Sequence, residues 1–81
     1  MILIRFSLNN DTCSLIRNTR IVPLLEGAGF RRQGTGEFVL DHSTAAGFQA
    51  ISQMIDALSF VGGNSRVGGV AIDHFWIYFT G

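Results

Sequence analysis

The chain of 81 residues contains no lysine, one cysteine and one proline, and it has no long apolar run. A single cysteine, Cys13, cannot form a disulfide within the chain or supply a cluster of metal ligands, which is typical of a reducing compartment. No apolar run reaches the roughly 20 residues that a membrane-spanning helix needs, and the opening MILIRF lacks the basic start and cleavage site of a signal peptide. We therefore expect a cytoplasmic protein that has no membrane partner.

Net charge is also absent, because six arginines balance six acidic residues. A neutral chain has no overall attraction to nucleic acid. The planar guanidinium of arginine matches phosphate and carboxylate, but an all-arginine basic set is equally expected from a GC-rich genome. Charge composition therefore leaves nucleic-acid binding open.

The composition is that of a globular protein, with 47% hydrophobic and 15% charged residues. Residues 1–81 are expected to form one domain, without internal repeats. A domain of this size buries a modest fraction of its surface, so a second subunit would add useful burial. We therefore expect a homodimer.

The first half of the chain predicts a strand and then a helix. Residues 1–8, MILIRFSL, place apolar side chains at every second position, which is the period of a half-buried strand. In the turn that follows, Asp11 or Thr12 could cap a helix. Pro23 predicts a kink or a restart of that helix near residues 19–23. The apolar stripe of the helix contains Leu15, Ile16, Thr19, Val22, Leu25 and Ala28.

Glycines mark the end of this helix and the reversal that follows. Gly27 and Gly29 in GAGF predict the helix end, with Phe30 folding back onto the apolar stripe. Residues 30–41 then predict two strands joined by a glycine-assisted turn, and the alternative is one long bent strand with a bulge at its glycines. We favour the hairpin.

The second half predicts another helix and a last strand. Ser43 or Thr44 could cap an amphipathic helix in TAAGFQAISQMIDAL, and the glycine-rich residues 61–69 predict a surface loop. The segment VAIDHFWIYFT is rich in aromatic and β-branched residues and predicts a strand with Phe75, Ile77 and Phe79 facing inward.

The element order β-α-β-β-α-β predicts an α+β domain of the ferredoxin-like type, in which an antiparallel sheet carries two helices on one face. The other face stays open, and any function is expected there or at a sheet edge. The arginines would project from strands, because a phosphate-binding loop needs a lysine and a following helix. The expected open-face residues are Leu3, Arg5, Ser7, His74, Trp76 and Tyr78, with some of Arg31, Arg32, Gln33 and Glu37.

Two Asp-His pairs are the obvious candidates for acid-base chemistry. Adjacent residues on a strand point to opposite faces, so neither Asp41 nor Asp73 should orient the imidazole of its neighbour. Asp41 and His42 are expected to end a strand and begin a helix cap. Strand alternation would turn Asp73 inward together with Phe75 and Ile77, so a bulge or an edge position must keep its charge out of the core. No group of histidine, cysteine and carboxylate has the spacing of a zinc site.

Trp76 and Tyr78 beside arginine have two interpretations. They could stack unpaired bases, as aromatic residues of RNA-binding sheets do, but the ribonucleoprotein signature is absent. Large aromatic residues beside arginine are also characteristic of the core of a dimer interface. We favour the dimer interface.

The layout of IRFSL, LLEGAGF, RRQGTGEFVLD, TAAGFQAISQMIDAL and a final strand resembles the virulence-associated protein D family and the small CRISPR-associated ferredoxin-like nucleases. The resemblance covers nearly the whole chain. It implies a homodimer and, in active members, cleavage of RNA or DNA by an aspartate at the end of the first strand of each subunit, often with a divalent metal. Ser7 stands at the matching position and cannot supply a carboxylate to hold magnesium. Asp11 is the nearest acid and would have to act from the following turn.

Two functions of different classes follow. The favoured one is a homodimeric interaction module without strong catalysis, with Leu3, Trp76 and Tyr78 at the interface and a further protein partner conceivable. It needs no cofactor or metal. The alternative is a nucleic-acid-binding protein or metal-dependent endoribonuclease of the toxin or CRISPR-associated type, which would use magnesium on RNA or DNA. Its candidate phosphate contacts are Arg5, Arg31 and Arg32, and its candidate catalytic residues are Ser7 and Asp11.

Overall fold

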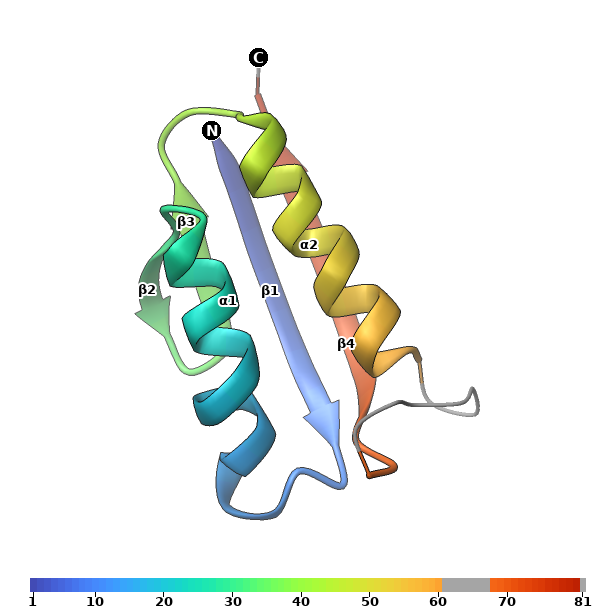
Figure 1. Cartoon of the computed structure of the whole chain (residues 1–81). Helices are drawn as coiled ribbons and strands as arrows, with labels where there is room; N and C mark the ends of the chain where they lie inside the picture. The colour runs from blue at the N-terminus through green and yellow to red at the C-terminus, as the bar shows by residue number, and fades with distance from the viewer. Residues whose placement is uncertain (61–67, 81) are drawn as a thin grey trace.

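The computed structural model describes residues 1–60 and 68–80, so residues 61–67 of the predicted glycine-rich loop lie outside the described residues. The chain is a small α+β protein with a four-stranded antiparallel sheet and two helices (Figure 1). The strand order is β2-β3-β1-β4, so β2 and β4 are the edges. The elements are β1 (Ile2–Asn9), η1 (Thr12–Ser14), η2 (Arg17–Ile21), α1 (Val22–Gly27), β2 (Arg31–Gly34), β3 (Glu37–Leu40), α2 (Ala45–Leu58) and β4 (Ala71–Phe79).

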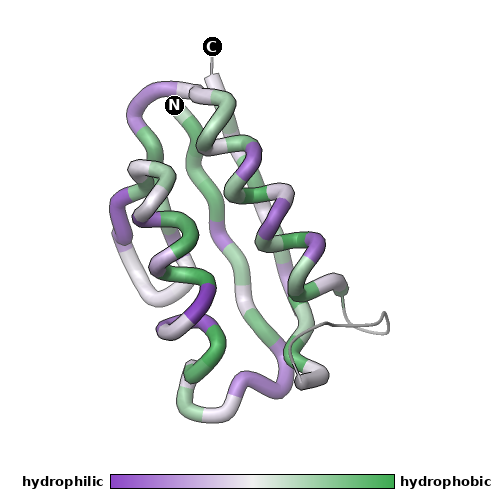
Figure 2. The backbone as a smooth tube through the Cα atoms, in the orientation of Figure 1, coloured by the Kyte–Doolittle hydropathy of each residue, from purple (hydrophilic) through white to green (hydrophobic). Residues whose placement is uncertain are grey.

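The core lies between the sheet and the helices. In β1, Ile2, Ile4 and Phe6 are buried and alternate with more exposed residues, which confirms the predicted half-buried strand. The ring of Phe6 stacks on that of Phe38 from β3, with centroids 5.9 Å apart. Figure 2 shows that polar and apolar residues alternate along α2. Its apolar residues Ala50, Ile51, Met54 and Leu58 are buried in the core. The other members of the core are Ile21, Leu25, Phe30, Leu40, Val70 and Ile72.

The first helical region is interrupted where Pro23 predicts it. A π-helical turn, η2, runs directly into α1, and Pro23, which has no N–H to donate, stands in the first turn of α1. The predicted apolar stripe is wrong at Leu15 and Thr19, which are exposed, whereas Ile21 is buried. A π-turn bond spans one residue more than an α-helical bond, so the residues before and after it no longer share one stripe.

The predicted helix end at GAGF is confirmed. Gly29 has a φ of 99°, in the left-handed region that favours glycine. Its N–H donates to the carbonyl of Glu26 at 3.0 Å, and the N–H of Phe30 donates to that of Leu25 at 3.0 Å, which together form a Schellman motif. The side chain of Phe30 then joins the core.

The hairpin is also confirmed, since β2 and β3 pair in antiparallel fashion around a turn at Thr35 and Gly36. The turn lies against β1, where the N–H of Phe6 donates to the carbonyl of Gly36 at 2.8 Å. A Cβ at Gly36 would overlap the carbonyl oxygen of Phe6. This position therefore requires glycine because two backbones approach each other closely.

The predicted cap of α2 is Thr44, whose hydroxyl oxygen accepts a hydrogen bond from the N–H of Gly47 at 3.0 Å. Asp41 and His42 lie between β3 and this cap, as the sequence predicts. Gly47 is buried, and a Cβ there would overlap Leu40 of the sheet. The glycine therefore lets α2 approach the sheet closely.

A bulge in β4 accommodates Asp73. Ser7 pairs with His74 and Leu8 pairs with Ile72, so Asp73 is the extra residue that has no partner in β1. Its side chain is exposed, which confirms the prediction that a bulge or an edge position keeps Asp73 out of the core. The bulge keeps Ile72 in the core while the rest of β4 alternates correctly.

Candidate interaction surface on the open sheet face

Strand pairing determines which side chains share the open face. Leu3 lies opposite Val39 on one side and Tyr78 on the other. One step along β1, Arg5 lies between Glu37 and Trp76. Because directly paired residues point to the same face, these two rows and the pair of Ser7 with His74 belong to the face away from the helices. The open face that the sequence predicts is thus assembled from β1, β3 and β4.

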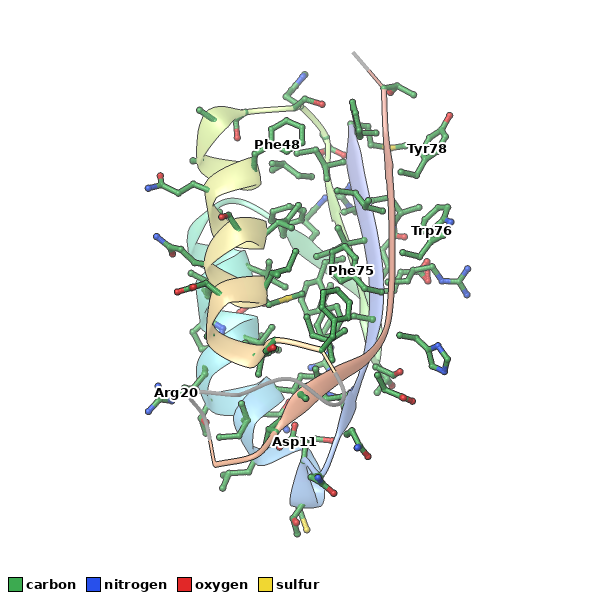
Figure 3. All side chains as sticks on the ribbon, turned by 90° about the vertical axis from the view of Figure 1, so that its right-hand side faces the viewer. Asp11, Arg20, Phe48, Phe75, Trp76 and Tyr78 are labelled. Atoms are coloured by element: carbon green, nitrogen blue, oxygen red, sulfur yellow. The ribbon has the colours of Figure 1, made fainter. Side chains whose placement is uncertain are left out.

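Two aromatic rings dominate the β4 side of this face. Trp76 and Tyr78 are 46% and 47% exposed, and their rings stack with centroids 6.0 Å apart and planes inclined by 6°. The guanidinium of Arg5 lies 6.0 Å from the centroid of the Trp76 ring. Figure 3 shows Trp76 and Tyr78 pointing away from the helices, on the opposite side of β4 from Phe75. A stacked, half-exposed aromatic pair of this kind is typical of interface anchors.

The arginines predicted as phosphate contacts do not form one group. Arg31 pairs with Val39 and lies on the open face, but Arg32 pairs with Phe38 and so lies on the helix-covered face. The guanidinium of Arg31 binds the carboxylate of Asp41, with 2.8 Å between Nη2 and Oδ1.

The other open-face arginine also lies near an acid. Nε of Arg5 is 3.9 Å from Oε2 of Glu37, a loose ion pair because both side chains remain accessible to water. A phosphate would have to compete with a carboxylate for Arg5 and for Arg31.

An open hollow of about 590 Å³ lies beside the aromatic pair. Its polar side chains include Arg5, Ser7, Glu37 and His74, and the hairpin turn forms one wall. Arg17, which no sequence motif marks as functional, fixes this wall. Nη1 of Arg17 donates to the carbonyl of Thr35 at 2.9 Å, and Nη2 donates to the hydroxyl of Ser14.

The bulge brings His74 and Asp73 together, with 3.4 Å between Nε2 and Oδ2. The prediction that adjacent residues cannot meet is therefore wrong for this pair, because a bulge breaks the alternation of side chains. The imidazole is nevertheless 83% exposed. Within the described residues, Ser7 lies opposite His74 in the pairing but makes no hydrogen bond with it. This arrangement lacks the desolvated, hydrogen-bonded geometry that activates a serine.

Asp11 is engaged in local structure. Its Oδ1 accepts the N–H of Ile16 at 2.8 Å, and its Oδ2 accepts the N–H of Arg17 at 3.0 Å. These amides belong to the first turn of the helical region, so the carboxylate acts as a cap. Asp11 borders a second hollow with Arg20, whereas Ser7 borders the hollow beside Trp76. The structure therefore does not bring the two candidate catalytic residues into one pocket.

No metal centre is evident in the part of the chain that the structure describes. Among these residues, no three His, Cys, Asp or Glu side chains gather closely enough to hold an ion.

The helix-covered side of β4 contains apolar residues that the sequence analysis assigned to the core. Phe75 is half-buried, but Ile77 and Phe79 are 38% and 59% exposed. The ring of Phe79 contacts that of Phe48 from α2 edge-on, with centroids 5.7 Å apart. These residues face the helix side as predicted, but they are not buried, because β4 is an edge strand and no other strand among the described residues pairs with its outer side here. Side-chain alternation in a sequence does not reveal which strand lies at an edge.

Comparison of the chain with protein-family models, curated proteins and solved structures finds no match. Over residues 1–60 and 68–80, no helix is both long enough and apolar enough to span a bilayer.

Proposed function

We propose that the protein is a homodimeric interaction module that binds a second copy of itself through β4 and has no strong catalytic activity. The observation that carries this proposal is the gathering of exposed apolar side chains on one strand. Exposed apolar residues in such a group are typical of interaction sites. They are Trp76, Ile77, Tyr78 and Phe79, with Phe48 beside them.

The charges of the open sheet face support a protein partner over a phosphate backbone. Arg5 and Arg31 both lie near carboxylates, and Asp73 lies beside His74. Mixed charges around an apolar centre are typical of the rim of a protein interface. A nucleic-acid surface would present basic side chains free of acidic partners.

The element order and the strand order β2-β3-β1-β4 support a finer proposal for the fold, the ferredoxin-like class. The proposed kinship with the virulence-associated protein D family and the small CRISPR-associated nucleases rests on the layout of the chain. Ser7 in place of the family's aspartate supports a member in which cleavage has been lost.

Sedimentation velocity over a range of protein concentrations tests the proposed function. We expect a homodimer at micromolar concentration and an indole emission from Trp76 that shifts to longer wavelength on dilution. A Leu15→Ser variant, which removes an exposed apolar side chain outside Trp76–Phe79, should leave the dimer unchanged. A strict monomer at high concentration would refute the homodimer.

A second candidate function, binding of single-stranded RNA, is favoured by one observation. The guanidinium of Arg5 lies over Trp76 beside the open hollow, a combination that can bind phosphate and stack a base. Arg5→Ala should then reduce the dependence of RNA affinity on salt by about one phosphate contact. Arg32→Ala, on the other face, serves as the control. RNA affinity that is absent, or unaffected by salt, would exclude this function.

A further inference from the structure

The two edges of the sheet differ in how they are protected from pairing. β2 is short, and its residues Arg31, Arg32 and Gln33 are polar and exposed. β4 has nine residues, and its segment Phe75–Phe79 contains neither a charge nor a proline. Charged side chains, prolines and short strands are the devices that prevent edge-to-edge association. β4 therefore lacks the protection that β2 has.

The first part of β4 is already covered. The N–H of Ile72 donates to the carbonyl of Ser59 at 2.8 Å, and Phe60 forms an isolated bridge with Ile72. The bulge at Asp73 then ends this covered part. Among the described residues, no such contact is seen beyond the bulge, along the aromatic segment Phe75–Phe79.

The direction of the backbone groups follows from the end of the strand. The N–H of Thr80 donates to the carbonyl of Met1 and therefore points toward β1. Since the direction of the backbone N–H and C=O groups alternates along a strand, those of Trp76 and Tyr78 also point toward β1. Phe75, Ile77 and Phe79 then direct their N–H and C=O groups to the outer edge. This edge offers hydrogen bonds to another strand.

The segment is also symmetric about its centre. Phe75 and Phe79 lie at equal distances from Ile77 along the chain, and so do Trp76 and Tyr78. A two-fold axis through Ile77 would therefore pair phenylalanine with phenylalanine and one large aromatic residue with another. Two-fold interfaces require such self-complementarity.

We infer that two copies pair antiparallel along their β4 edges, with the two-fold axis at Ile77, so that the two sheets form one continuous sheet. This inference rests on the proposed homodimer and specifies its geometry. Phe75 and the partner's Phe79, like Ile77 and the partner's Ile77, exchange both backbone hydrogen bonds. Trp76 lies opposite the partner's Tyr78 in a non-hydrogen-bonded pair, where side chains are closest.

This geometry has a consequence for the open face. An edge-to-edge dimer buries Ile77 and Phe79 on the helix side, and it leaves the hollow beside Arg5 and Ser7 accessible. A dimer formed by stacking two open faces would do the opposite, burying Ser7 and leaving Ile77 outside.

Charge variants at the axis separate these arrangements. Ile77→Lys places two like charges opposite each other in the edge-to-edge dimer, and we expect the dissociation constant to rise by about 100-fold or more. Ile77→Glu has the same effect for the same reason. Mixing the two variant proteins restores a dimer, because opposite charges then meet at the axis. Restoration also shows that each variant is folded.

Ser7→Arg is the control for the open face and leaves the edge-to-edge dimer intact. A wild-type protein that is monomeric refutes the proposed function together with this inference. A wild-type dimer that persists in Ile77→Lys and is lost in Ser7→Arg refutes only the edge-to-edge geometry, in favour of stacked open faces. Failure of the two Ile77 variants to restore a dimer on mixing places the axis elsewhere and overturns the inference.

Discussion

At the scale of single residues, the positions that matter most are those where backbones meet. Gly36 and Gly34 belong to the same hairpin, yet their surroundings differ. A Cβ at Gly36 would overlap the backbone of β1, whereas the nearest atom to a Cβ at Gly34 is Glu37 Cβ at 3.8 Å. Backbone in the middle of a paired sheet cannot move aside easily, so one hairpin contains a glycine that is required and one that is replaceable.

Gly36→Ala should therefore lower the free energy of unfolding by about 2 kcal/mol, the usual effect of overpacking. Gly34→Ala is the matched control and should change it by less than about 0.5 kcal/mol. Urea denaturation of the two variants gives both values. Equal effects would show that turn flexibility, and not close approach, explains Gly36.

Asp11 distinguishes a structural carboxylate from a catalytic one. Its two oxygens accept the N–H groups of Ile16 and Arg17, so Asp11→Ala should destabilise the fold by about 1 kcal/mol through loss of the cap. Thr12→Ala, at a neighbouring exposed position, should have little effect. Thermal unfolding measures both. Magnesium-dependent cleavage of RNA that Asp11→Asn abolishes at unchanged stability would instead give this residue a catalytic role.

At the scale of elements, the bulge at Asp73 joins two parts of β4 whose pairing registers with β1 differ by one residue. Ile72 lies in the core and His74 on the open face, and these residues would alternate correctly if Asp73 were absent. The bulge therefore adds a residue without moving any other side chain to the wrong face.

Deletion of Asp73 should consequently leave the fold intact, because the β1–β4 pairing becomes regular. Deletion of Ile4, which is fully buried in β1, is the control and should unfold much of the protein, since every residue on one side of it moves to the opposite face. Circular dichroism and unfolding temperatures compare the two proteins. Equal loss of structure would contradict the assigned register.

The elements were predictable from sequence where the signal is local. The strand alternation of β1, the glycines of GAGF and the cap at Thr44 each depend on neighbouring residues, and the structure confirms them. The exposure of Leu15 and of Ile77 was not predictable. The first depends on a π-turn that shifts the helical stripe, and the second depends on which strand forms an edge.

The candidate site was predictable to a similar degree. Side-chain parity placed Arg5 and Trp76 together on the open face, as the pairing shows. Parity could not reveal the contact between His74 and Asp73, because a bulge changes side-chain direction without a distinct sequence pattern. It also could not assign Arg32 to the opposite face, since this required the register of the hairpin.

At the scale of the whole molecule, the two edges of the sheet differ. The β2 edge is protected from pairing by polar, exposed residues, and the β4 edge has an aromatic segment without such protection. An unprotected strand of aromatic residues would favour aggregation unless one defined partner covers it. The proposed symmetric pair would close this edge and leave β2, with its arginines, at both outer edges of the assembly. Such a dimer would be finite, because the protected edges would not extend it.

Exchange of backbone amide hydrogens in β4, followed by NMR, tests most directly whether two copies pair along Phe75–Phe79. At concentrations where the protein is dimeric, the amides of Phe75, Ile77 and Phe79 should exchange slowly, and dilution to the monomer should speed them up. The amides of Trp76 and Tyr78, which point toward β1, should stay slow at both concentrations. Fast exchange at Phe75, Ile77 and Phe79 in a protein that is demonstrably dimeric would contradict the edge-to-edge account.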